Sequence, residues 1–132
     1  MVEFVFYSGE YPNLCRGVLV LKIDGYQYAF FPHSKHWGNP WGLESKHNLE
    51  KVKSYYEDPN TTNVYSYSLV SGGCAGVDDN LEEYCEEGEW GVDFSQATLD
   101  DDYRFIIGED LHEAIERCVN ENVPFGCCGG CI

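Results

Sequence analysis

Lysine and arginine are scarce in this 132-residue chain, which has 8 of them against 23 aspartates and glutamates and a formal net charge of −15. Residues 54–103 include neither lysine nor arginine, although this stretch carries thirteen carboxylates. Proteins that bind DNA, RNA or an anionic membrane need basic side chains to meet phosphates, so the charge argues against all three as direct partners. It favours a basic protein partner, a cation, or solubility alone.

Recognisable catalytic motifs are also missing. The chain contains no nucleophile elbow, zinc-protease helix, phosphate-binding loop or paired-glutamate pattern. It has no apolar run long enough to span a membrane, and its first residues lack the basic and apolar regions of an export signal. We therefore expect a cytoplasmic protein that is not an enzyme, with its seven cysteines mostly reduced.

What the chain does contain is enough apolar material for a core. Hydrophobic residues make up 43% and aromatic residues 15%, which excludes a disordered acidic tail because such tails are poor in both. The length is that of one domain, so residues 1–132 are predicted to form a single acidic domain. A short cysteine-containing tail covers residues 125–132.

Hydrophobic periodicity and turn residues divide the chain into predicted strands and helices. The clearest signal is Asp24-Gly25 between two apolar runs, which predicts a hairpin with a type I′ turn. Further strands are predicted at residues 2–7, 63–70, 90–94 and 103–107, and helices at 45–57, 79–88 and around 111–119. Hairpins without βαβ units predict an α+β fold, with an antiparallel sheet of about five to six strands and two or three helices packed on one face.

The predicted helix at 79–88 carries a stripe of four glutamates opposite its apolar face. Like charges four positions apart cost about 0.2–0.5 kcal/mol per pair, and no nearby lysine relieves them. Repulsion kept over two turns indicates a surface that meets positive charge, although a solvated face that serves solubility is the simpler alternative. The predicted partner-binding carboxylates are Asp78, Asp79, Glu82, Glu83, Glu86, Glu87, Glu89, Asp93, Asp100, Asp101 and Asp102.

Carboxylates along a rigid surface can imitate a nucleic-acid backbone. The leading hypothesis is therefore a non-enzymatic inhibitor that blocks a basic partner, one that handles nucleic acid. In composition alone the chain resembles phage-encoded inhibitors of host defence, such as anti-CRISPR proteins, and immunity proteins against nuclease toxins. Trp37 and Trp41 are candidate anchors for the partner, with packing of the loop over the hairpin as the alternative.

The cysteines support a second hypothesis. Cys128 and Cys131 have the spacing of a zinc half-site, Cys127 adds a third thiol, and Cys118 is a candidate fourth ligand. No cofactor is the primary expectation, with zinc as the alternative in a thiol-stabilised module that has an assembly or regulatory role. Cys118 also fits a small buried hydrophobe on an apolar helix face.

A third hypothesis is an enzyme of unspecified reaction. Its candidate residues would be His33 or His36 acting with a cysteine.

Overall fold

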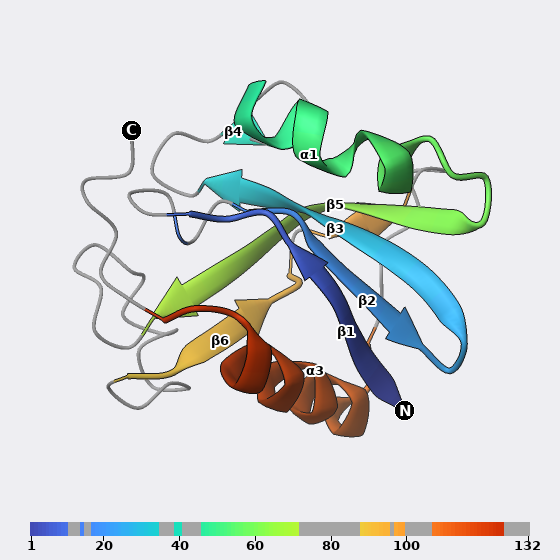
Figure 1. The fold of residues 1–132 in the computed structure, drawn as a ribbon. Helices are drawn as coiled ribbons and strands as arrows, with labels where there is room; N and C mark the ends of the chain where they lie inside the picture. The colour runs from blue at the N-terminus through green and yellow to red at the C-terminus, as the bar shows by residue number, and fades with distance from the viewer. Residues whose placement is uncertain are drawn as a thin grey trace.

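A curled β-sheet with a helix on each face makes up the described part of the protein (Figure 1). The computed structural model describes residues 1–10, 14, 17–34, 39–40, 46–71, 88–95, 97–99 and 107–125. The main strands lie in the order β1-β2-β3-β5-β6, with β4 paired to β3 and β7 to β5. The elements are β1 (Val2–Tyr7), β2 (Leu19–Ile23), β3 (Tyr26–Ser34), β4 (Asn39–Pro40), α1 (Lys46–Tyr56), β5 (Thr61–Ser71), β6 (Trp90–Asp93), β7 (Thr98–Leu99) and α3 (Glu109–Asn122).

Most predicted elements are present close to their predicted bounds. The helix predicted at 45–57 is α1, the strands predicted at 63–70 and 90–94 correspond to β5 and β6, and the C-terminal helix is α3. The helix predicted at 79–88 and the strand predicted at 103–107 lie mostly outside the described residues. Gly88, the last residue of that predicted helix, is described, and its φ of 90° is the left-handed backbone in which helices commonly end at glycine.

The predicted hairpin is confirmed. Strands β2 and β3 pair antiparallel, with Ile23 opposite Tyr26 across the two-residue turn. Asp24 and Gly25 both have positive φ, at 52° and 87°, as a type I′ turn requires. The twist of this turn matches that of the strands, so a local sequence signal was sufficient to predict the pairing.

The sheet is mixed, and the prediction of a wholly antiparallel sheet is wrong. Strands β3 and β5 are parallel, in a register that runs from Gln27 opposite Thr61 to Pro32 opposite Tyr67. Between them α1 carries the chain back to the end of the sheet where β3 begins, which makes β3-α1-β5 a βαβ unit. Parallel neighbours need such a crossover, whereas a short turn joins only antiparallel strands.

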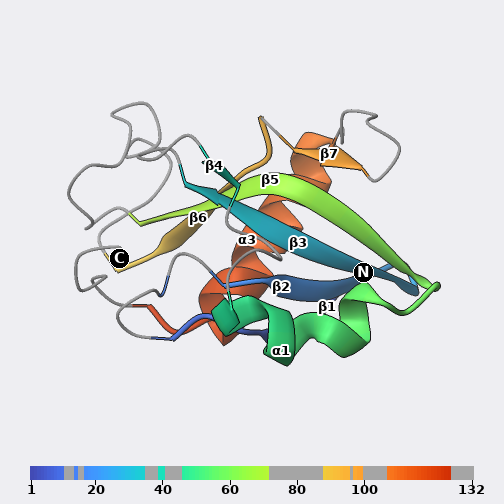
Figure 2. The same ribbon diagram turned by 90° about the horizontal axis from the view of Figure 1, so that it is seen from above.

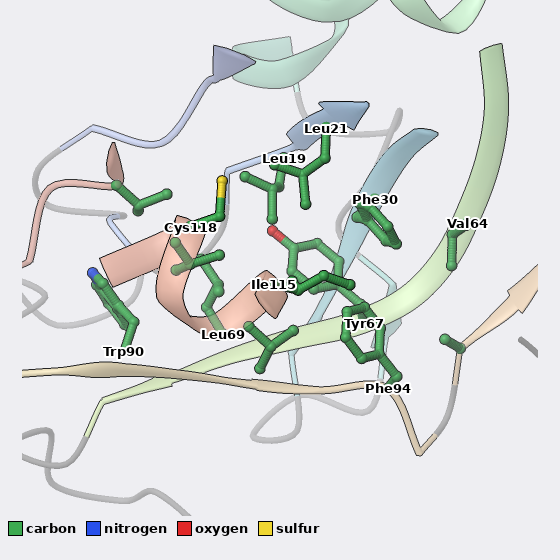
Figure 3. Packing of buried hydrophobic residues seen from close by; sticks show 14 of the residues in the cluster. Leu19, Leu21, Phe30, Val64, Tyr67, Leu69, Trp90, Phe94, Ile115 and Cys118 are labelled. Carbon is green, nitrogen blue, oxygen red and sulfur yellow. The ribbon is translucent and has the colours of Figure 1, made fainter. Parts of the chain in front are cut away.

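The two described helices cover opposite faces of the sheet, so the prediction that the helices share one face is also wrong (Figures 1 and 2). Strand β2 is apolar on both faces, and Leu19, Val20 and Leu21 are all fully buried. A strand buried on both sides needs cover on both sides. One core cluster joins Leu19, Leu21 and Phe30 to Ile115, Cys118 and Val119 of α3 (Figure 3), and the other joins Val18, Val20, Ala29 and Phe31 to Val52 of α1.

A bulge in β5 curls the sheet. The register between β3 and β5 shifts after Phe31, which leaves Ser66 as an extra residue with a left-handed φ of 64°. Pro32 stands at the same point, where its missing N–H is tolerated. Bulges bend a strand and increase its twist. The curl brings both outer strands, β1 and β6, into contact with α3 (Figure 1).

Candidate protein-binding surface

The outer edge of β6 is hydrogen-bonded to side chains of α3. The Trp90 backbone N–H donates to Asn120 Oδ1 at 2.6 Å, and Asn120 Nδ2 donates to the Trp90 carbonyl oxygen at 2.7 Å. The carboxamide therefore takes the place that a neighbouring strand would occupy. Both backbone groups of Trp90 are satisfied without a further strand.

His112 makes a second contact of this kind, two turns earlier on α3. Its Nε2 lies 2.6 Å from the Val92 carbonyl oxygen, and because a carbonyl only accepts, the proton is on Nε2. The ring packs edge-on against Phe94, with centroids 5.8 Å apart. Glu116 lies one turn further along, with Oε1 3.6 Å from the same nitrogen. His112 and Asn120 thus hold α3 alongside β6.

Trp90 anchors the end of this contact in the core. Its side chain is 2% exposed, and the indole N–H donates to the Pro124 carbonyl oxygen at 3.0 Å. Phe125 covers the indole, with ring centroids 5.4 Å apart. The C-terminal end of α3 and the segment that follows it are therefore tied to β6 by both backbone and side-chain contacts.

Seven carboxylates lie on α3 and β6 or directly beside β6, and we call this set the acidic surface. Five of the side chains are exposed and two, on Asp93 and Glu116, are half-buried. Arg117 is the only lysine or arginine on α3. The acidic surface consists of Glu89, Asp93, Glu109, Asp110, Glu113, Glu116 and Glu121.

The helix dipole accounts for only part of this acidity. Glu109 and Asp110 lie in the first turn of α3, where negative charge stabilises the helix. Glu113 and Glu116 lie beyond that turn, and Glu121 lies in the last turn, where negative charge is unfavourable. The acidic surface is therefore not arranged for the stability of the helix alone.

The opposite face of the sheet has a different charge. Lys51 and Lys53 are exposed on α1, together with the acidic Glu50. Lys51 Nζ lies 2.6 Å from Glu10 Oε1, so one of these cations is paired. Across the sheet, the α3 side is strongly acidic while the described part of α1 is mixed. Seven of the thirteen described carboxylates thus belong to the acidic surface, and the other six lie elsewhere in the chain.

Only two of the predicted partner-binding residues are described. Glu89 is exposed beside β6, and Asp93 ends β6 with its Oδ1 accepting from the Ser95 N–H at 2.9 Å. The other predicted acids, both tryptophans and His36 lie outside the described residues, and of His33 only the backbone is described. The glutamates of α3 were not among the predicted partner-binding residues, because acids at the start of a helix are expected from the helix dipole alone. Their spacing at positions 109, 113 and 116 was the available signal.

Cys118 is the one predicted metal ligand within the described residues. It is a free cysteine in the core cluster under α3, pointing toward the sheet in Figure 3. Burial raises the pKa of its thiol above the ordinary value of 9.0, and Asn122 Nδ2 lies 3.8 Å from the sulfur. A protonated, buried thiol behaves as a small hydrophobe. In the part of the chain that the structure describes, no three His, Cys, Asp or Glu side chains are grouped as a metal site requires.

No protein family, characterised protein or solved structure matches the chain. Neither described helix has the length and apolar character needed to cross a membrane. The arrangement of charge and hydrogen bonds is therefore the basis for any functional conclusion.

Proposed function

We propose that the protein is a non-enzymatic, acidic binding protein that blocks a basic partner, one that handles nucleic acid. The observation on which this proposal chiefly rests is the acidic surface, seven carboxylates on α3 and on or beside β6. Such a surface raises the local concentration of a positively charged partner and speeds its association.

The rigid attachment of α3 supports the same proposal. Asn120 and His112 hold the helix to the backbone of β6, and Ile115 and Val119 are fully buried beneath it. Carboxylates on a fixed helix lose less conformational freedom on binding than carboxylates on a mobile segment. An inhibitor that competes with nucleic acid needs its charges held in place.

The spacing of the carboxylates is compatible with imitation of a phosphate backbone. Glu109, Glu113 and Glu116 follow one another at about 6 Å and about 4.5 Å along the helix axis. Phosphates on one DNA strand advance by about 3.4 Å along the duplex axis. The carboxylates are thus spaced on the same scale, at lower density. A free Cys118 thiol fits the proposed cytoplasmic location.

The test compares two double variants of equal net charge. The first variant, Glu113→Lys with Glu121→Lys, reverses two charges of the acidic surface. The second, Glu50→Lys with Glu57→Lys, reverses one charge on α1 and one directly after it. All four side chains are exposed. Each protein is titrated into cleavage assays of a panel of basic nucleases acting on DNA. The first variant should raise the half-inhibitory concentration about tenfold or more, because each reversed contact costs on the order of 1 kcal/mol.

The second variant should inhibit like the wild type, and inhibition by the wild type should weaken as salt is added. Added non-cleavable DNA should also compete with the protein for the same nuclease. Equal inhibition by both variants would show that the acidic surface is not the binding site. The absence of inhibition across the panel would overturn the assigned class of partner.

A further inference from the structure

The second edge of the sheet, on β1, differs from the β6 edge. Within the described residues β1 pairs only with β2, so its outer side carries no strand. Leu111 and Cys118 of α3 share a core cluster with Val2 and Phe4 of β1. Side chains of this kind pack against β1 but offer its backbone no strong hydrogen bond.

The hydrogen bonds between β1 and β2 determine which backbone groups of β1 point outward. The Asp24 N–H donates to the Met1 carbonyl oxygen at 3.0 Å, so Met1 and Asp24 form a hydrogen-bonded pair. Bonded and non-bonded pairs alternate along an antiparallel ladder, which turns the backbone groups of Glu3 toward Lys22 on β2. The N–H and C=O groups of Val2 and Phe4 therefore point away from the sheet.

The side chains of this edge give it little protection against pairing. Natural edge strands are shielded by lysine, proline, short length or bulges. On β1 only Glu3 is charged, proline is missing, and the bulge at Val5 comes after the outward groups of Val2 and Phe4. Val2, Phe4 and Val5 are apolar and only half-buried. An added strand would complete the burial of these side chains.

The charge around β1 indicates what kind of segment could pair with its outer edge. Glu3 is exposed on the α1 side of β1, opposite Lys22. At 100° per residue, Asp110 and Glu121 lie on the side of α3 away from His112 and Asn120, and hence toward β1, with the cationic Arg117 within about 40° of both. A second copy of this chain would bring another net charge of −15 to the same place, and repulsion disfavours that pairing. A cationic segment is favoured.

We propose that the outer edge of β1 binds an extended segment of a partner protein in which basic and apolar residues alternate. Its backbone pairs with the N–H and C=O groups of Val2 and Phe4, as in strand addition to other sheet edges. Its apolar side chains continue the face of Val2 and Phe4, and a basic side chain lies beside Glu3. The backbone pairing at Val2 and Phe4 uses no residue of the acidic surface, whereas Asp110 and Glu121 of that surface contribute to the charge beside β1.

The test measures amide hydrogen exchange in the full chain with a short blocked peptide of alternating lysine and valine. In the free protein the amides of Val2 and Phe4 should exchange rapidly, while the Trp90 amide, bonded to Asn120, should exchange slowly. Saturating peptide should slow exchange at Val2 and Phe4 about tenfold or more and leave Trp90 unchanged. A peptide of alternating glutamate and valine should produce a much smaller effect.

Two matched variants separate backbone pairing from side-chain contact. Val2→Pro removes an outward N–H and should weaken peptide binding about fivefold to tenfold, the equivalent of one lost hydrogen bond. Val2→Ala keeps that N–H and should bind within about twofold of the wild type. Equal binding by Val2→Pro and the wild type, or slow exchange at Val2 and Phe4 in the free protein, would overturn the proposal. Concentration-dependent dimers with protection at the same amides would overturn it in favour of a second copy.

Discussion

Both outer strands of the sheet contact α3, but the helix makes hydrogen bonds to the backbone of β6 and packs against side chains of β1. At β6, α3 presents Asn120 and His112, which bond to the backbone of Trp90 and Val92. At β1, Leu111 and Cys118 of the same helix pack in a core cluster with Val2 and Phe4. Among the described residues, α3 thus bonds to the backbone of β6, whereas β1 has no hydrogen-bonded neighbour other than β2. Contact between a helix and an edge strand does not by itself satisfy the edge; the type of side chain at the contact decides.

The largest expected loss of stability comes from truncating Trp90, whose side chain anchors β6 in the core. Trp90→Ala should lower the free energy of unfolding by about 3–5 kcal/mol, because the buried indole loses its packing and its bond to Pro124. Phe4→Ala, at the half-buried β1 edge, should cost only about 1 kcal/mol. Urea unfolding measures both. Similar losses at the two positions would show that the edges are equally well packed.

A smaller loss of stability is expected when the Asn120 carboxamide, which bonds to the backbone of β6, is removed. Asn120→Ala removes both bonds to the Trp90 backbone and should destabilise the protein by about 2 kcal/mol. Exchange of the Trp90 amide should then approach that of Val2. The control is Asn122→Ala, which removes bonds to Cys118 within α3 and should cost about 0.5 kcal/mol. If Asn120→Ala left Trp90 protected, the carboxamide would not be what closes this edge.

His112 should contribute less than Asn120 to the free energy of unfolding, because it makes one hydrogen bond to β6 and Asn120 makes two. His112→Leu should lower the free energy of unfolding by about 1 kcal/mol through loss of the contact with the Val92 carbonyl. Glu116→Gln should change it by less than about 0.5 kcal/mol, because the His112–Glu116 contact is long and partly exposed. A larger effect from Glu116 than from His112 would assign the stabilisation to the ion pair instead.

The smallest expected effect is a pH dependence of stability caused by the buried thiol of Cys118 on α3. Burial raises the pKa of its thiol above 9.0, so the folded state binds the proton more tightly than the unfolded state. Stability from this group is complete below pH 9 and falls as the pH rises through the raised value. The stability difference between wild type and Cys118→Ala should therefore shrink from about pH 7 to about pH 10, measured by urea unfolding in reductant. A constant difference would show that the thiol is not desolvated.

Local patterns predicted the elements of this fold better than their arrangement. Asp24-Gly25 predicted the hairpin and the apolar spacing of 111–119 predicted α3, because both signals act over a few residues. The parallel pairing of β3 and β5 was missed, since nothing local distinguishes a strand with a parallel neighbour from one with antiparallel neighbours. The contact of Asn120 with Trp90 joins residues 30 positions apart and depends on how α3 docks.

The acidic surface was predicted in part. Glu89 and Asp93 stood out from the sequence because no basic residue lies near them in the chain. The acids of α3 did not, because Glu109 and Asp110 already had an explanation in the helix dipole. Only docking of the helix beside β6 shows that these acids and Glu89 belong to one side of the protein.

The left-handed backbone of Ser66 bears on both edges of the sheet, because it accompanies the bulge that bends β5. A residue other than glycine with a φ of 64° costs on the order of 1–3 kcal/mol, which the surrounding packing must offset. A β-branched residue there would resist this conformation and favour a straighter β5, whereas glycine would adopt it freely. A straighter β5 would reduce the curl that accompanies the contact of α3 with both outer strands. Ser66 lies two residues before Ser68, the first β5 residue paired with β6, so the left-handed residue stands where β5 turns toward the margin that Asn120 and His112 bond.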